Sequence, residues 1–104
     1  MFRKMTLPLL ASCLALSAAQ ASEAIVKKAR CVSCHAVDKK MVGPAYKDVA
    51  AKYRGDTSAP TRLAAKVRAG GAGVWGEVPM LPHPADKISD ADLAAAIDWI
   101  LALQ

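Results

Sequence analysis

Four stretches of the chain repeat apolar residues every three or four positions, and this spacing predicts four amphipathic helices. Alanine is abundant in all four stretches, which favours helix and allows the first and last helices to cross closely. The predicted apolar faces are Ile25, Val26 and Ala29; Tyr46, Val49, Ala50 and Tyr53; Leu63, Ala64 and Val67; and Leu93, Ala96, Ile97, Ile100 and Leu101.

Start and stop signals set the bounds of these helices. Ser22 can cap the first helix, with Glu23 in its first turn. Proline suits the first turn of a helix, and glycine suits its end. The expected boundaries are Pro44 and Gly55 for the second helix, Pro60 and Gly70-Gly71 for the third, and Ser89, in a capping box with Asp92, for the start of the fourth. We therefore expect one small all-α domain without internal repeats.

The segment from Gly73 to Pro84 breaks the helical pattern. Its sequence is Gly-Val-Trp-Gly-Glu-Val-Pro-Met-Leu-Pro-His-Pro, with three prolines and two glycines. This composition argues against a helix and predicts an ordered, irregular loop. Met80 lies near the centre of that loop.

The first residues have the order of a secretory signal peptide: a basic start, an apolar run from Leu7 to Ala19 and a small-x-small ending at Ala21. The run is shorter than the roughly 20 residues that a membrane anchor needs. A lipoprotein signal ending at Cys13 is the alternative, disfavoured because the apolar run continues past it. We expect residues 1–21 to be removed and residues 22–104 to form a periplasmic domain without stable membrane insertion.

Length and charge narrow the possible functions. The formal net charge is +5 over 104 residues, and the basic residues are spread along the chain. A nucleic-acid-binding protein would show a concentrated basic stripe instead, so we expect no nucleic-acid partner. A chain this short buries a modest core and usually needs a disulfide, metal or cofactor to stabilise it. We expect a monomer.

The sequence Cys31-Val32-Ser33-Cys34-His35 is the chemically distinctive motif. Two thiols one helical turn apart can add across the two vinyl groups of haem, and the adjacent imidazole then binds iron from the proximal side. The motif predicts one covalent haem c, attached through Cys31 and Cys34, with His35 as an iron ligand.

Three other interpretations of this motif are weaker. A thioredoxin-like redox pair belongs in a βαβ setting, and no β-rich run occurs in the sequence. A zinc site needs about four ligands, and Cys31, Cys34, His35 and His83 lack the usual paired spacing. A structural disulfide leaves His35 unexplained. The export signal and the chain length also favour haem.

The candidates for a second iron ligand are Met41, Met80 and His83. Met41 follows His35 too closely to reach over the ring, whereas the other two lie far enough along the chain to do so. A lone methionine is more often core packing, but a stiff loop around Met80 suits a fixed thioether ligand. Methionine ligation raises the reduction potential and keeps small molecules from the iron, which favours electron transfer.

The sequence resembles the small bacterial class I cytochromes c, in particular the cytochrome c-551/c8 group. The motifs that carry the resemblance are Cys31-Val-Ser-Cys-His35, Val42-Gly-Pro-Ala45, Gly73-Val-Trp-Gly76, Val78-Pro-Met80 and the C-terminal Ala-Ile-Asp-Trp-Ile-Leu helix. They cover essentially all of residues 22–104 in the family's order. The resemblance implies an all-α fold wrapped around one covalently attached haem.

The resemblance also implies roles for individual residues. His35 and Met80 would be the axial ligands, and the Pro44 carbonyl would accept a hydrogen bond from the His35 ring N–H, which fixes the ring. The Trp75 indole N–H would point at a haem propionate, with Lys66 as a basic residue near the same propionate.

The sequence departs from this group at His83. The group commonly has Asn three residues after its methionine ligand, and that Asn donates a hydrogen bond to the methionine sulfur. His83 could donate the same bond and give the reduction potential a pH-dependent component. Alternatively, its ring points into solvent.

We therefore expect a carrier of single electrons and not an enzyme. The alternative is an open-site haem protein, either a gas sensor or a peroxidase-like enzyme, which the sequence opposes because His83 is its only spare distal group. The resemblance implies nitrite reductases, terminal oxidases, peroxidases or photosynthetic centres as redox partners. Surface lysines such as Lys27, Lys39 and Lys40 would steer brief docking through a small interface.

Overall fold

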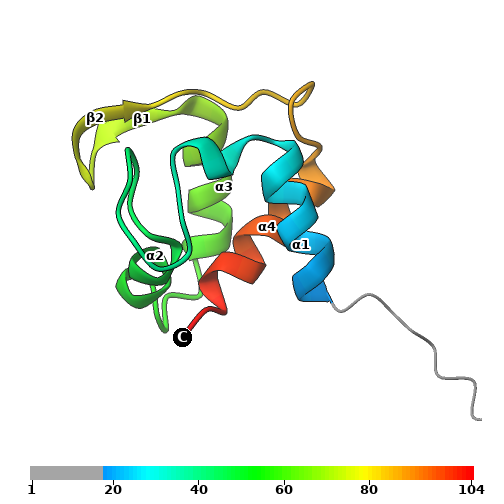
Figure 1. Cartoon of the computed structure of the whole chain (residues 1–104), viewed down its shortest axis with the longest axis horizontal. Coiled ribbons are helices and arrows are strands. Elements are labelled where there is room, and N and C mark those ends of the chain that lie inside the picture. Colours follow the sequence, from blue (N-terminus) through cyan, green and yellow to red (C-terminus); the bar gives the residue numbers. More distant parts are fainter. Residues whose placement is uncertain (1–17) are drawn as a thin grey trace, which may run out of the picture.

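The structure, a computed structural model, describes residues 18–104 and consists of helices with one short sheet (Figure 1). The α-helices are α1 (Ala18–Lys28), α2 (Tyr46–Lys52), α3 (Ala59–Ala69) and α4 (Asp90–Leu101). The remaining elements are a 3-10 helix, η1 (Cys31–Ser33), and the strands β1 (Gly71–Gly73) and β2 (Gly76–Met80). The four predicted helices are all present, which confirms the predicted helical class.

Most of the predicted signal peptide, residues 1–17 with Cys13, lies outside the described residues. The predicted cleavage after Ala21 falls within α1 of the full chain and stays a prediction. Within residues 18–104, no helix combines the length and the apolar character needed to cross a bilayer.

The start of α1 differs from the prediction that Ser22 caps this helix. The helix begins at Ala18, and Ser22 lies inside it with only 4% of its surface exposed. The Ser22 hydroxyl donates to the carbonyl oxygen of Ala95 in α4 at 3.4 Å. The hydroxyl is therefore used where the two helices cross, and the small side chain allows their close approach.

The predicted boundaries of α3 and α4 are confirmed. In α4, the Ser89 hydroxyl accepts a hydrogen bond from the Asp92 amide at 3.1 Å, which is N-capping. Helix α3 begins at Ala59 with Pro60 in its first turn, where the missing amide costs no hydrogen bond. It ends at Gly70, whose φ of +69° is a backbone conformation that other residues rarely adopt.

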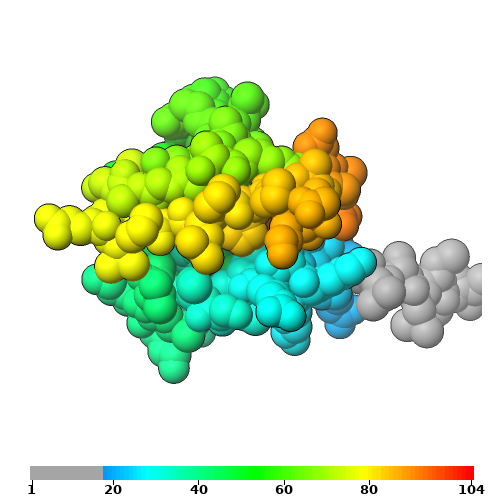
Figure 2. Space-filling view, turned by 90° about the horizontal axis from the view of Figure 1, so that it is seen from above, coloured from blue at the N-terminus to red at the C-terminus, as the bar shows by residue number. Residues whose placement is uncertain are grey.

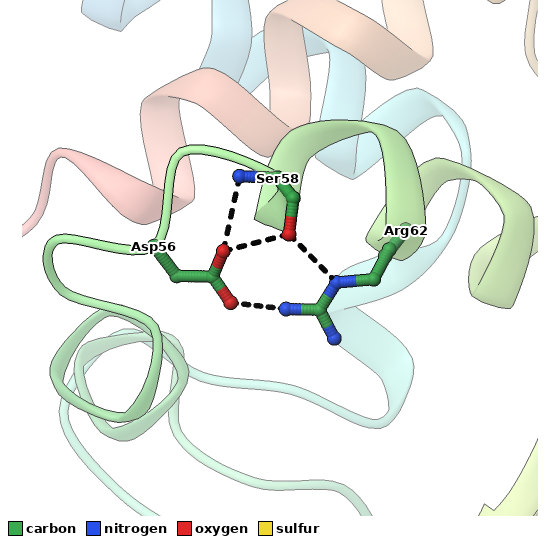
Figure 3. Close-up of polar contacts among 3 residues, drawn as sticks. All are labelled: Asp56, Ser58 and Arg62. Atoms are coloured by element: carbon green, nitrogen blue, oxygen red, sulfur yellow. Dashed lines mark hydrogen bonds and ion pairs between the residues drawn. The ribbon is translucent and has the colours of Figure 1, made fainter.

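An exposed polar cluster joins α3 to the turn that precedes it (Figure 3). The Asp56 carboxylate accepts hydrogen bonds from the Ser58 amide at 3.0 Å and the Ser58 hydroxyl at 2.8 Å. Arg62 forms an ion pair with Asp56 and donates from Nε to the Ser58 hydroxyl at 3.0 Å. The Ser58 hydrogen bonds, assisted by the Arg62 charge, hold the pKa of Asp56 below its ordinary value.

The core lies where α4 packs against the other helices. Its buried members are Ile88, Leu93 and Ile97, and partly buried residues of α1, α3 and α4 pack around them. Figure 1 shows α4 passing between α1 and α3. The partly buried residues are Ile25, Ala29, Leu63, Ala64, Val67 and Leu101. The apolar faces predicted from sequence spacing are therefore the faces that pack together.

Part of the segment predicted to be an irregular loop is a β-hairpin. Gly71 pairs with Met80 and Gly73 pairs with Gly76, with an irregularity between the two pairs. Gly73 and Gly76 both have a φ of +118°, which permits a tight reversal. Glycine and proline disfavour strands, so residue type alone does not reveal this pairing.

After β2 the chain crosses one face of the molecule and enters α4. Residues 81–89 contain turns but no helix or strand. Figure 2 shows segment 76–88 (yellow to orange) lying between α3 (green) and the segment that follows α1 (cyan). This course places the loop with Met80 beside the segment that carries the cysteine motif.

Candidate functional site

The two cysteines of the motif lie on one helical turn. Arg30 enters the turn with a left-handed backbone, and the amides of Cys34 and His35 donate to the Cys31 carbonyl at 3.1 and 3.0 Å. Residues three apart in a 3-10 turn lie above one another, so both thiols stand on the same side. Both are free thiols, one half-buried and one exposed. Burial raises the pKa of the Cys31 thiol above its ordinary value.

The His35 ring is held by three neighbours. Its Nδ1 lies 2.8 Å from the Pro44 carbonyl oxygen. Because a carbonyl only accepts, Nδ1 carries the proton in this bond and Nε2 keeps its lone pair. The Tyr46 ring stacks on the imidazole with centroids 5.3 Å apart, and a Cβ at Gly43 would lie 2.4 Å from Cε1. The ring is therefore fixed with Nε2 as the nitrogen available to a metal.

Tyr46 connects this part of the site to the helical core. It is 4% exposed, and Trp99 of α4 packs edge-on against it at 5.9 Å. Its hydroxyl lies near the Cys31 thiol without forming a hydrogen bond of normal geometry. Burial raises the pKa of this hydroxyl far above its ordinary value, and the Cys31 thiol adds to the rise.

Met80 ends β2 at the point where the hairpin meets α3. Gly70 approaches so closely that a Cβ there would lie 2.5 Å from the Met80 carbonyl oxygen and 2.8 Å from the Pro82 nitrogen. The other residues of β2 are exposed, whereas Met80 is half-buried. The backbone that carries the predicted second ligand is therefore packed directly on the end of α3.

The resemblance places Trp75 and Lys66 near a haem propionate; Trp75 belongs to the hairpin, and Lys66 of α3 lies next to it. Trp75 lies in the reversal between the strands, with the Lys52 ammonium 5.5 Å from its ring centroid. The Lys66 ammonium lies over the start of β1, because a Cβ at Gly71 would be 3.4 Å from Lys66 Nζ. Contact of either residue with a propionate stays a prediction.

His83 makes contacts that the sequence does not predict. Its ring Nδ1 donates to the Leu81 carbonyl at 2.8 Å, and its amide donates to the Val67 carbonyl at 3.0 Å. Its own carbonyl accepts from Arg68 at 3.1 Å. The ring nitrogen Nδ1 thus bonds to a loop carbonyl, and the residue is half-buried. A bond from the ring to the Met80 sulfur stays a prediction. Arg68 carries no sequence signal, because a basic residue late in a helix is ordinarily a solvated one.

The donor set and the apolar surface of the structure fit a haem. Imidazole and thioether are both ligands of haem iron, and two free thiols one turn apart match the two vinyl groups. Within the described residues, the large apolar side chains that are exposed come from the two segments that carry His35 and Met80. They are Val32, Met41, Val42, Val74, Trp75, Val78 and Leu81. Exposed large apolar side chains are a cost to a folded chain in water, and a flat apolar macrocycle bound between these two segments would cover them.

Comparison with known proteins agrees with this site. The sequence profile of the cytochrome c family matches residues 19–104. Cytochrome c-552 of Nitrosomonas europaea is 50% identical over 86 residues, which are 83% of this chain and 82% of the relative. Cytochrome c-551 of Allochromatium vinosum is 54% identical over 79 residues, covering 76% and 82%. The crystal structure of the Nitrosomonas europaea cytochrome c552 aligns with a TM-score of 0.72 and 50% identity, over 79% of this chain and 99% of that one.

The fold and the site define a class I c-type cytochrome. The chain belongs to the cytochrome c family and, within it, to the c-551 group of small electron-carrying cytochromes. It carries one covalently attached haem c with its iron. The predicted family, fold class and cofactor are therefore confirmed.

Proposed function

We propose that this cytochrome is a single-electron carrier whose haem iron is bound by His35 and Met80, with Cys31 and Cys34 forming the two thioether bonds. The observation that carries the proposal is the 2.8 Å contact between His35 Nδ1 and the Pro44 carbonyl oxygen. It presents Nε2 as a ligand of fixed orientation and raised basicity. When bound, the haem supplies a one-electron change between ferric and ferrous iron.

The placement of Met80 supports a carrier over an enzyme. Its backbone packs on Gly70, and proline residues stiffen the loop on either side. A thioether held in this way would be the second protein ligand of the iron, and the iron would then have no free position for a substrate. The residues around the haem then serve to keep both ligands still while one electron enters or leaves.

The ligation can be tested in the oxidised holoprotein. We expect the far-red absorption band of methionine–iron ligation in the wild type and in Met41→Ala, which removes an exposed methionine. Met80→Ala should lose the band and bind carbon monoxide rapidly after reduction. A wild type that lacks the band and binds carbon monoxide rapidly at neutral pH would indicate an open-site gas sensor or peroxidase-like enzyme instead.

We infer that the partners are redox proteins that dock briefly beside the haem. Lys39 and Lys40 are exposed in the loop that follows the cysteine motif, and Lys27 is exposed at the end of α1. Nitrite reductases, terminal oxidases, peroxidases and photosynthetic centres are candidate partners. Steering by these lysines predicts that the rate of electron transfer to an acidic partner falls as ionic strength rises. An unchanged rate would contradict it.

We also propose that residues 1–21 are removed during export to the periplasm, as the order of basic, apolar and small residues indicates. N-terminal sequencing of the purified protein should then begin at Ser22. A blocked, lipidated N-terminus at Cys13 would contradict this cleavage site and place the protein on a membrane surface through its lipid.

A further inference from the structure

One guanidinium group bonds to both ends of the loop that joins Met80 to α4. Arg68 lies in the last turn of α3, and its side chain is only 23% exposed. Nη1 donates to the carbonyl oxygens of His83 at 3.1 Å and Ile88 at 2.7 Å. Nη2 forms an ion pair with Asp90 at 2.6 Å. All of these acceptors follow Met80 in the sequence.

The acceptors are spread over the whole return path of the chain. His83 lies shortly after Met80, Ile88 is a buried core residue, and Asp90 is the first residue of α4. The planar guanidinium offers five N–H donors in a rigid fork, so one side chain can bind acceptors that lie in different directions. Bonds from a charged donor are also stronger than neutral ones. Arg68 therefore fixes both the start and the end of an otherwise irregular segment.

Two backbone contacts from the same end of α3 also hold the segment that follows β2. The Val67 carbonyl accepts the His83 amide at 3.0 Å, and Gly70 packs against the Met80 carbonyl. Ion pairs on a protein surface usually contribute little, but this one adds to two hydrogen bonds with loop carbonyls. The Met80 loop thus packs against the end of α3, and Arg68 is the side chain of α3 that bonds to the loop.

We propose that Arg68 is a positioning residue for the Met80 thioether: it acts through the loop from His83 to Ile88 and keeps Met80 in place without touching the haem. This inference rests on the proposed function, in which Met80 is an iron ligand. Loss of Arg68 should let the loop open more often while the helices stay folded. The iron would then become accessible to an added ligand.

The test compares Arg68→Met with the wild-type holoprotein and with Arg62→Met as a matched control. Arg62 lies on the same helix and loses the same charge and a comparable set of polar contacts, but with Asp56 and Ser58. The first readout is the rate at which imidazole replaces the Met80 ligand in the oxidised protein. The second is hydrogen exchange of the His83 amide, which does not depend on the haem spectrum. Urea unfolding followed by far-UV circular dichroism reports global stability.

In Arg68→Met we expect both the imidazole rate and the His83 exchange rate to rise about tenfold or more, as loss of a bond to a charged donor allows. The Arg62→Met control should match the wild type in both. Arg68→Lys should fall between, because a single ammonium cannot reach all three acceptors. Equal imidazole rates in Arg68→Met and Arg62→Met would overturn the proposal. The contacts of Arg68 with the loop would then have no effect on Met80.

Two further results keep the proposal testable. If Arg68→Met does not fold, Asp90→Ala removes one of the three acceptors and should raise the imidazole rate by a smaller factor, and no rise would overturn the proposal. If the wild type lacks the far-red band, the proposed Met80 ligation fails, and this inference fails with it. Failure of the inference alone would show a normal wild-type band and unchanged imidazole rates in every variant.

Discussion

Gly43 lies against the His35 imidazole so closely that a Cβ at residue 43 would stand 2.4 Å from Cε1 and 2.8 Å from Nδ1. The same Nδ1 lies 2.8 Å from the carbonyl oxygen of the next residue, Pro44. Any movement of the ring that relieves a clash with residue 43 therefore disturbs this hydrogen bond. The backbone of two adjacent residues thus sets the orientation of the His35 imidazole.

Replacement of Gly43 by alanine should displace the His35 ring. We expect a loss of about 1–3 kcal/mol in the free energy of unfolding, as for other overpacked sites, and faster exchange of the Nδ1 proton in NMR spectra. Gly55→Ala is the control: Gly55 has a φ of +81° and no neighbour within 4 Å, so it tests backbone strain alone. An unchanged Nδ1 proton in Gly43→Ala would contradict the proposed restraint.

The helices were predictable because their signals are local. Apolar spacing defined the faces that pack in the core, and Ser89 and Pro60 marked the starts of two helices. The prediction failed for Ser22, because a contact with α4, far away in the sequence, decides its role. It also missed the hairpin from Gly71 to Met80, which depends on backbone pairing that residue propensity does not reveal.

The candidate site shows the same division. The cysteine motif and Met80 could be proposed from the sequence because their chemistry is visible in residue type and spacing, and the role of Met80 stays a prediction. The restraints on His35 by Gly43 and Tyr46, and the link from Arg68 to the Met80 loop, come from tertiary contacts. Glycine, tyrosine and arginine are common residues with many ordinary roles, so nothing in the sequence distinguishes them as parts of the site.

The crossing of α1 and α4 should not tolerate a large side chain at Ser22. Ser22 is 4% exposed, so Ser22→Leu would overpack the contact with Ala95. We expect the free energy of unfolding to fall by about 1–3 kcal/mol, measured by urea denaturation. Ala24→Leu, at an exposed position on the same helix, should stay within about 0.5 kcal/mol of the wild type. Equal effects of Ser22→Leu and Ala24→Leu would show that the contact between α1 and α4 can accommodate a larger side chain.

The Tyr46 hydroxyl should be dispensable for stability, whereas its ring should not. The hydroxyl is buried without a hydrogen-bond partner among the described residues, so its burial is a cost. We expect Tyr46→Phe to match the wild type or to gain up to about 1 kcal/mol in urea denaturation. Tyr46→Leu removes the stacking on His35 and the edge contact with Trp99 and should be clearly less stable. A large loss in Tyr46→Phe would reveal a hydrogen bond at this hydroxyl.

The cluster of Asp56, Ser58 and Arg62 should make stability depend on pH in the acid range. The Ser58 hydrogen bonds and the Arg62 charge lower the pKa of Asp56 in the folded protein, so folding favours the carboxylate. A depressed folded pKa contributes stability above the unfolded pKa of about 3.9, and this contribution disappears as pH falls through the folded pKa. The melting temperatures of the wild type and Asp56→Asn should therefore differ most near neutral pH and converge below about pH 4.

Ser58→Ala keeps the Asp56 carboxylate but removes the hydroxyl donor, so its pH profile should lie between those of the wild type and Asp56→Asn. A difference between the wild type and Asp56→Asn that stays constant over this range would show that the charge of Asp56 is not what Ser58 and Arg62 stabilise.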